Sequence, residues 1–449
     1  MKKIIFTLIV CVMATITIQA QTAAVNLPRF FSDGMVLQRE TNAPFWGFAD
    51  AGSKIEVTAS WDNKKVETTT PESGKWMVEL ATPKAGGPYT IKVNETTINN
   101  VKIGEVWFCS GQSNMKMRLG EADKWTVQDD NNTNICFFEV PVARSSEPLS
   151  TISEGEWRSG VIDNNMQHIS AVGYYFARRL QEELKIPIGM IGFYEGGTHA
   201  EEWTSPEVFK TLSQDVQSAL PSDREAGSLY NAMVYPVLPY KGSGFIWYQG
   251  ENNNGYSQTY SPLLKAMVEG WRKDFKNDYL PFYIVQLTTF STDFSDFRYI
   301  QQQLSEEIPN SGIAVTIDCG DQGNIHPTNK YPVGTRLGDM ALAKVYGKDK
   351  PAGSPTYREM KVEGNKIRIY FDHAEKGLKI TSGNYPFFFE IAGSDNVFEA
   401  ANARIEGNTI LLWSDNIESP TQARYFKKNY AEPNLFSEDG YPVAPFVTK

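Results

Sequence analysis

The stretch Gly104-Glu-Val-Trp-Phe-Cys-Ser-Gly-Gln-Ser-Asn-Met115 changes from apolar to small and polar near its middle. Its apolar part, Val106–Cys109, has the bulky, uncharged composition of a strand that is buried on both faces, as the strands of parallel sheets are. The polar part begins at Ser110 and contains a glycine and a second serine. This pattern predicts a parallel sheet in which one strand ends at a turn whose small and polar residues could bind or react with a ligand.

Similar apolar runs follow along the chain, with helical periodicity between them. The further runs are Ile188–Phe193, Phe245–Tyr248, Phe282–Leu287 and Ile313–Asp318. Apolar residues recur at helical spacing over Val172–Leu184, about Pro262–Phe275 and Val333–Val345. Alternating strands and helices predict an α/β domain with a central parallel sheet, which we place at residues 103–350.

Polar and glycine-rich segments follow four of the predicted strands. They are Ser110–Met115, Glu195–Thr198, Gln249–Asn252 and Asp318–Pro327. Because ligands bind beyond the carboxyl ends of parallel strands, these distant segments should meet at one edge of the sheet. The sequence therefore predicts a single site that is assembled from all of them.

Ser113 and His326 are the candidates for a nucleophile and its base, because a serine hydroxyl needs a neighbouring base to attack. The histidines of the chain are His168, His199, His326 and His373. Of these, His326 lies on the loop after the last predicted strand, with Asp318 and Asp321 nearby as candidates to orient its ring. A single histidine is more often structural, and the predicted meeting with Ser113 is what favours catalysis here.

Gly197 and Gln249 are candidates for an oxyanion hole. Gly197 offers a backbone N–H without a side chain in the way, and Gln249 offers an amide N–H. Each also has an ordinary structural interpretation, Gly196-Gly197 as a turn and Gln249 as a partner of the neighbouring loop.

Both flanks of the α/β region have the alternating pattern of β-structure. Residues 21–102 include Lys54–Ser60, Lys75–Leu80 and Tyr89–Val93, separated by glycine and proline turns. Residues 351–449 include Lys366–Phe371, Phe387–Ile391 and Thr409–Trp413. We therefore expect an N-terminal β-sandwich and a C-terminal β-rich module.

Residues 1–20 have the features of a secretory signal peptide. Lys2 and Lys3 precede an apolar run from Ile4 to Ile18, and Ala20 provides a small residue for cleavage. Cleavage there predicts a secreted or periplasmic protein and changes the formal net charge from −10 to −12, since both lysines are lost. So acidic a chain repels nucleic acid, and no later segment has the ~20 apolar residues of a membrane span.

The cysteines beyond the signal match neither a disulfide framework nor a zinc site. Cys109, Cys136 and Cys319 are odd in number and widely spaced. We expect small buried thiols.

The sequence between Gly104 and Met115 resembles a signature of the sialate O-acetylesterase family, a branch of the SGNH hydrolases. Similar segments are Phe31–Arg39, Gly86–Thr90, Ser170–Phe176, Gly196–Thr198, Leu229–Asn231, Trp247–Glu251, and Ile325–Pro327 with Lys330. The resemblance covers nearly the whole mature chain. It implies an SGNH-type three-layer sandwich that removes acetyl groups from sugar hydroxyls without metal or another cofactor. It also implies Ser113 as nucleophile, His326 as base, and Ser113 N–H, Gly197 and Gln249 as oxyanion donors.

One departure concerns the residue that orients the imidazole. Many SGNH hydrolases have an Asp three residues before the histidine, where this chain has Gly323, and Asn324 stands where relatives often have Asp. Asp321, Asp318 or a backbone carbonyl could orient His326 instead. Gln249 replaces the Asn of the wider superfamily, as is usual in this branch.

The sugar itself stays open between acetylated sialic acid and acetylated xylan or another plant glycan. Trp107, Tyr194, Trp203 and Tyr248 could line a sugar site, and each could equally be a core residue. Arg118 could pair with a sialate carboxylate or be a solvated surface residue.

Two other classes of protein remain to be weighed. Glu195 and Glu251 both follow predicted strands and could form the carboxylate pair of a glycosidase, although we favour Glu251 as a hydrogen-bonding brace of the site. The chain could instead be an inert glycan-binding protein that uses Trp46, Trp61 and Trp76 of the N-terminal flank. Tryptophans in a β-sandwich are more commonly core residues.

Overall fold

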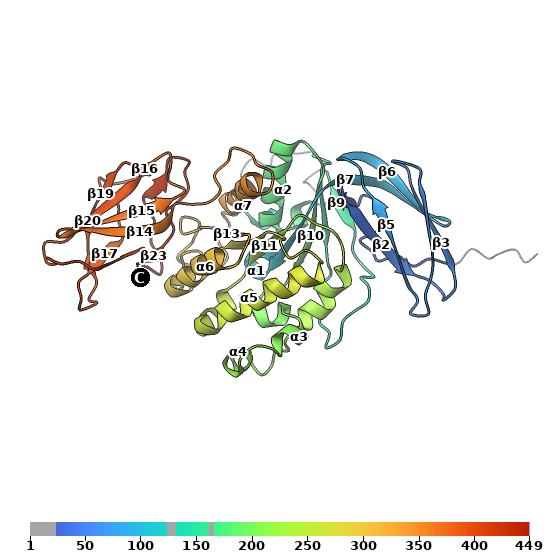
Figure 1. Cartoon of the computed structure of the whole chain (residues 1–449), viewed down its shortest axis with the longest axis horizontal. Helices are drawn as coiled ribbons and strands as arrows, with labels where there is room; N and C mark the ends of the chain where they lie inside the picture. The colour runs from blue at the N-terminus through green and yellow to red at the C-terminus, as the bar shows by residue number, and fades with distance from the viewer. Residues whose placement is uncertain (1–23, 124–131, 161–165, 449) are drawn as a thin grey trace, which may run out of the picture.

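The computed structural model describes residues 24–123, 132–160 and 166–448. An N-terminal β module, a central α/β unit and a C-terminal β module follow one another along the long axis of the molecule (Figure 1). The predicted fold class is confirmed. The predicted signal peptide lies outside the described residues.

The central sheet has the strand order β13-β12-β11-β7-β10-β8-β9, parallel throughout except for β9 at the edge. Its strands are β7 (Thr96–Gly111), β8 (Ile135–Glu139), β9 (Trp157–Ser159), β10 (Ile188–Tyr194), β11 (Phe245–Tyr248), β12 (Phe282–Val285) and β13 (Ser311–Ala314). Each of the five predicted apolar runs overlaps one of these strands, but β13 begins two residues before the predicted run Ile313–Asp318 and ends at Ala314. The strands β8 and β9 were not predicted.

Helices cover both faces of this sheet, which gives the three layers (Figure 1). On one face α2 (Ala171–Leu184) packs against α7 (Tyr331–Lys344). On the other face lie α5 (Ser257–Asp274) and α6 (Ser295–Glu307). The prediction for α5 began five residues too late, because the helix contains Pro262 rather than starting there. The helix α6 was not predicted.

The strand β7 belongs to both the N-terminal module and the central sheet. Its first part pairs with β6 (Gly86–Val93) and β1 (Val36–Gln38), and its second part pairs with β10 and β11. The boundary that we placed between residues 102 and 103 therefore falls inside one continuous strand. The rest of the N-terminal module consists of β2 (Asn42–Phe48), β3 (Lys54–Ala59), β4 (Lys65–Thr69) and β5 (Lys75–Ala81).

The C-terminal module consists of small antiparallel sheets. The first contains β14 (Thr356–Glu363), β15 (Lys366–Asp372), β20 (Thr409–Trp413) and β19 (Asn402–Glu406). The second contains β18 (Glu399–Ala400), β17 (Phe389–Ala392), β21 (Gln422–Tyr425) and β23 (Phe446–Val447), and β16 (Leu378–Ile380) pairs with β22 (Leu435–Ser437). Side-chain hydrogen bonds join the C-terminal module to the central unit, such as the one from the Tyr441 hydroxyl to Asp339 Oδ2 at 2.6 Å.

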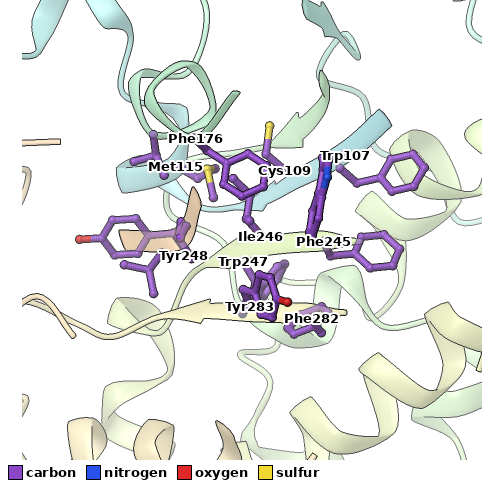
Figure 2. Packing of buried hydrophobic residues seen from close by; sticks show 14 of the residues in the cluster. Trp107, Cys109, Met115, Phe176, Phe245, Ile246, Trp247, Tyr248, Phe282 and Tyr283 are labelled. Atoms are coloured by element: carbon purple, nitrogen blue, oxygen red, sulfur yellow. The ribbon is translucent and has the colours of Figure 1, made fainter. Parts of the chain in front are cut away.

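Aromatic side chains fill the core between the sheet and its helices (Figure 2). Trp107 stacks on Tyr283 with ring centroids 5.8 Å apart and meets the edge of Phe176 at 5.0 Å. Trp46 and Trp76 are buried and Trp61 is partly buried in the N-terminal module, so these rings serve packing. Cys109, Cys136 and Cys319 are buried free thiols, as predicted.

Within residues 24–123, 132–160 and 166–448, no helix has the length and apolar character needed to cross a membrane.

Candidate active site

The carboxyl ends of β7, β10 and β11 meet where the sequence predicts a site. Gly111, the last residue of β7, is in register with Tyr194 of β10 and Tyr248 of β11. A Cβ atom at Gly111 would lie 2.1 Å from the Tyr248 carbonyl oxygen, and its φ of +139° also favours glycine. This close approach lets the chain turn directly into α1 (Ser113–Lys116), which begins with Ser113.

The structure brings Ser113 and His326 into contact. His326 lies on the loop between β13 and α7, and its Nε2 is 2.8 Å from Ser113 Oγ. A hydroxyl and an imidazole at this distance can exchange a proton.

His326 is held through its main chain. Its N–H donates to Asn324 Oδ1 at 2.9 Å, and the carbonyl of Ile325 accepts from Asn114 Nδ2 at 3.0 Å. Partial burial and, to a lesser extent, the charge of Lys330 lower the pKa of His326 below its ordinary value. The neutral imidazole, which is the form that can accept a proton, is therefore favoured.

Neither candidate aspartate contacts the imidazole. Asp321 is exposed, and its Oδ1 accepts the Gly323 N–H at 2.8 Å. Both oxygens of Asp318 are paired with Arg336, at 2.7 and 2.5 Å. Across the described residues, no carboxylate forms a hydrogen bond with the His326 ring. The orienting role of Asp321 stays a prediction without a supporting contact.

Gly196 and Gly197 lie beside the nucleophile. A Cβ atom at Gly196 would be 3.5 Å from Ser113 Cβ, so the turn packs closely against Ser113. Gly197 is exposed, with a φ of +69° and open space where a side chain would be. Among the described loop and turn hydrogen bonds, none uses the Gly197 N–H. This arrangement is compatible with the predicted oxyanion donor.

The side chain of Gln249 is bonded to neighbouring loops, which is the structural alternative to the oxyanion role. It is fully buried, and its amide nitrogen donates to the Thr198 carbonyl at 3.2 Å and to Asn253 Oδ1 at 2.7 Å. Both amide protons are thus engaged in holding the loop after Gly197. An oxyanion role for Gln249 stays a prediction and would require its amide to leave one of these partners.

A buried polar network lies beside the contact between Ser113 and His326. Lys330 Nζ donates to Asn114 Oδ1 at 2.5 Å, and Asn114 Nδ2 donates to Glu251 Oε1 at 2.6 Å. Burial lowers the pKa of Lys330 to about 7 and raises the pKa of Glu251. The bracing interpretation of Glu251 agrees with these contacts. Asn114 and Lys330 were not assigned roles from the sequence, although each is close in the chain to a predicted catalytic residue.

An open cleft of about 520 Å³ leads to the site. Its lining residues are Ser113, Lys116, Met117, Arg118, Glu121, Asn324, His326 and Thr328. Lys116 is paired with Glu195, whereas Arg118 is exposed, with Nη1 3.3 Å from His168 Nδ1. Arg118 is the sugar-binding candidate that the structure places in the cleft.

The proposed aromatic lining of a sugar site is corrected. Trp107, Tyr194, Trp203 and Tyr248 are at most 2% exposed, and none of them lines the cleft. Trp107, Tyr194 and Tyr248 belong to β7, β10 and β11, which are buried on both faces. Trp203 ends the short turn Ala200–Trp203, and its ring packs near Phe193 and Trp247 in the core. A glycosidase pair is also not formed, since Glu251 is bound to Asn114 below the cleft and Glu195 is bound to Lys116.

Comparisons with known proteins place the chain in a family of carbohydrate esterases. Residues 103–346 match the family model described as a carbohydrate esterase, sialic acid-specific acetylesterase. The sialate O-acetylesterase of Homo sapiens is 30% identical over 371 residues, covering 71% of this chain and 70% of that protein. The mouse (Mus musculus) sialate O-acetylesterase is 30% identical over 398 residues, covering 71% and 73%. The crystal structure of a carbohydrate acetylesterase from Xanthomonas citri matches with a TM-score of 0.87 at 31% identity, covering 95% of this chain and 100% of that one.

Proposed function

The chain belongs to the sialic acid-specific acetylesterase family of carbohydrate esterases, and from this premise we propose that Ser113 and His326 hydrolyse O-acetyl esters of sugars by acyl transfer. The observation that carries the proposal is the 2.8 Å contact between Ser113 Oγ and His326 Nε2, at residues that line an open cleft. A serine-type carboxylic ester hydrolase needs such a nucleophile and base within reach of its substrate.

In the first step, Ser113 Oγ attacks the acetyl carbonyl carbon and its proton moves to His326 Nε2. The tetrahedral oxyanion accepts hydrogen bonds from the backbone N–H groups of Ser113 and Gly197. The carbon–oxygen bond to the sugar then breaks, and the protonated His326 gives its proton to the departing sugar oxygen. The products of this step are a free sugar hydroxyl and acetyl-Ser113.

In the second step, water attacks the acetyl carbon while His326 takes its proton. The bond to Ser113 Oγ breaks, the proton returns from His326 to that oxygen, and acetic acid leaves, ionising to acetate. Serine and histidine are then in their starting states.

Substitution of the nucleophile tests this assignment. Ser113→Ala should lower kcat for acetate release by on the order of a millionfold, as loss of the nucleophile does in serine hydrolases. Ser110→Ala is the matched control, since Ser110 lies on the same strand end but is buried away from the cleft. Turnover by Ser113→Ala comparable with that of Ser110→Ala would refute the assignment.

For the substrate, we propose an O-acetylated sialic acid whose carboxylate pairs with Arg118. Arg118 lines the cleft, is exposed and is not among the ion-paired arginines of the described residues. A guanidinium binds a carboxylate in a two-pronged geometry that a neutral sugar cannot reproduce.

A panel of acetylated sugars tests the substrate proposal. Arg118→Met should raise KM for a 9-O-acetyl sialoside and leave KM for 4-nitrophenyl acetate unchanged. Faster acetate release from acetyl xylan than from the sialoside by the unmodified protein would favour the plant-glycan alternative instead.

For the location, we propose that the mature protein begins after Ala20 and is secreted or periplasmic. The basic start and the apolar run before Ala20 support this proposal. N-terminal sequencing of the protein from the extracytoplasmic fraction should read from Gln21, and an intact Met1 start there would contradict it.

A further inference from the structure

We propose that Asn114, Lys330 and Glu251 form a buried positioning network that holds the His326 loop against Ser113, in place of a carboxylate on the imidazole. The proposal rests on the proposed roles of Ser113 and His326. It assigns to these three residues a positioning function, since none of them touches the reacting atoms.

Asn114 joins the two halves of the site. It directly follows Ser113 in α1, and its Nδ2 donates to the carbonyl oxygen of Ile325 at 3.0 Å. Ile325 precedes His326, so one side-chain amide connects the nucleophile's helix to the loop of the base. A shift of this loop by about 1 Å would be enough to slow proton transfer strongly.

The two flanking charges determine which way the Asn114 amide points. Its oxygen faces the Lys330 ammonium at 2.5 Å, and its nitrogen faces Glu251 Oε1 at 2.6 Å. Below about pH 7, where Lys330 is charged, a flipped amide would turn its NH₂ group toward the ammonium and its oxygen toward the carboxylate, so both hydrogen bonds would become repulsive. Only the observed orientation leaves an N–H directed at Ile325.

The burial of Lys330 is unfavourable for stability. The side chain is 1% exposed, and among the described residues its ammonium has no ion-pair partner, only Asn114 Oδ1 and the face of the Tyr248 ring at 5.2 Å. Removing an ammonium from water is unfavourable, and an amide oxygen and a ring compensate for this loss incompletely. A lysine in such a place indicates a functional requirement more than a contribution to folding.

The charge of Lys330 also changes the pKa of His326, and in the direction opposite to the change that an aspartate would cause. A carboxylate beside an imidazole raises its pKa, whereas the Lys330 ammonium lowers it, together with burial. The other charged groups around His326 are Lys116, Arg118 and Glu121 of the same cleft, Glu251 of the network, and Asp321 and the Asp318–Arg336 pair on its own loop and α7. Loss of Lys330 should therefore raise the pKa of His326.

Two variants remove different parts of the network. Asn114→Ala keeps both charges and removes the link to Ile325, so kcat should fall on the order of 10–100-fold with little change in KM. Lys330→Met should lower kcat and move the acid limb of the pH profile to higher pH, while the melting temperature stays the same or rises. Activity is measured with 4-nitrophenyl acetate over about pH 4.5 to 8.5, beside the thermal unfolding of each variant.

Lys344→Met is the control for the loss of a lysine outside the site, although Lys344 is exposed and Lys330 is buried. Lys344 is a second lysine of low pKa near the other end of α7, and its ammonium donates to the Ser311 carbonyl at 2.9 Å, away from the site. This variant should keep both kcat and the acid limb of the wild-type protein.

Glu251→Gln retains an acceptor oxygen for Asn114 and should keep more of kcat than Glu251→Leu does.

The outcomes separate this proposal from the proposed function. Wild-type kcat and an unmoved acid limb in both Asn114→Ala and Lys330→Met, with Ser113→Ala inactive, would overturn the network and leave the nucleophile in place. Activity in Ser113→Ala would overturn the proposed function itself. If Lys330→Met does not fold, two other comparisons of kcat test the network. They are Asn114→Ala against the wild-type protein, and Glu251→Gln against Glu251→Leu.

Discussion

At the scale of single residues, some side chains of the site could be predicted from the sequence and others could not. Ser113 and His326 could be predicted because each follows an apolar strand run, and such strand ends converge. The contact of Lys330 with Asn114 could not be predicted, because it joins side chains 216 residues apart. The sequence also could not decide whether Trp107 and Tyr248 line the site or the core. A strand that is buried on both faces lacks the apolar and polar alternation that would tell its two faces apart.

The lowered pKa of His326 predicts the pH dependence of the wild-type enzyme. The base must be neutral, so activity is present above its pKa and is lost as the pH falls through it. Because burial and Lys330 lower this pKa from 6.5, the acid limb of kcat/KM should lie below pH 6.5. A profile of kcat/KM against pH measures this limb directly, and a midpoint above 6.5 would contradict the described environment of His326.

At the scale of elements, the loop after β13 carries His326 and is tied to α7 by a partly buried ion pair, in which the arginine is buried. Arg336 of α7 is 7% exposed and donates to both oxygens of Asp318 and to the Val315 carbonyl at 2.7 Å. The sequence predicted this strand and this helix but not their link, which depends on how α7 packs back onto the sheet. It also missed α6 and β8, which lie between clearer apolar runs.

Loss of Asp318 should destabilise the protein strongly. Asp318→Ala leaves the buried guanidinium of Arg336 without its partner, which typically costs about 3–5 kcal/mol. Asp372→Ala is the control, because Asp372 and Arg358 form an exposed pair at 3.5 Å, for which about 0–1 kcal/mol is expected. Urea unfolding of both variants gives their free energies of unfolding. Equal decreases in this free energy would show that the Arg336 pair stabilises the protein no more than a surface pair does.

At the scale of the whole molecule, the predicted layout of a central α/β unit between two β modules is confirmed, whereas the nature of the N-terminal junction was not foreseen (Figure 1). The predicted boundary assumed a break near residue 102, yet β7 runs without interruption from Thr96 to Gly111. Its N-terminal half is polar and partly exposed, whereas its C-terminal half is fully buried around the apolar run Val106–Cys109, and this contrast is typical of two separate strands. The two halves are one strand that passes from a half-exposed sheet to a buried one.

The shared strand predicts that the N-terminal module and the central sheet unfold together. Amides of β6 and β10 should then exchange with solvent through openings of similar free energy, since both are hydrogen-bonded to β7. Native-state hydrogen exchange at increasing denaturant measures these free energies. Exchange of β6 through a separate opening of much lower free energy would show that the N-terminal module is an independent unit.

The assignment of Ser113 as a nucleophile activated by His326 is tested most directly by covalent labelling. A serine-directed organophosphate should modify the unmodified protein once, and peptide mass mapping should place the adduct on Ser113. His326→Ala should react far more slowly, because the hydroxyl then lacks its base at 2.8 Å. An adduct on another serine, or equal labelling rates with and without His326, would contradict the assignment.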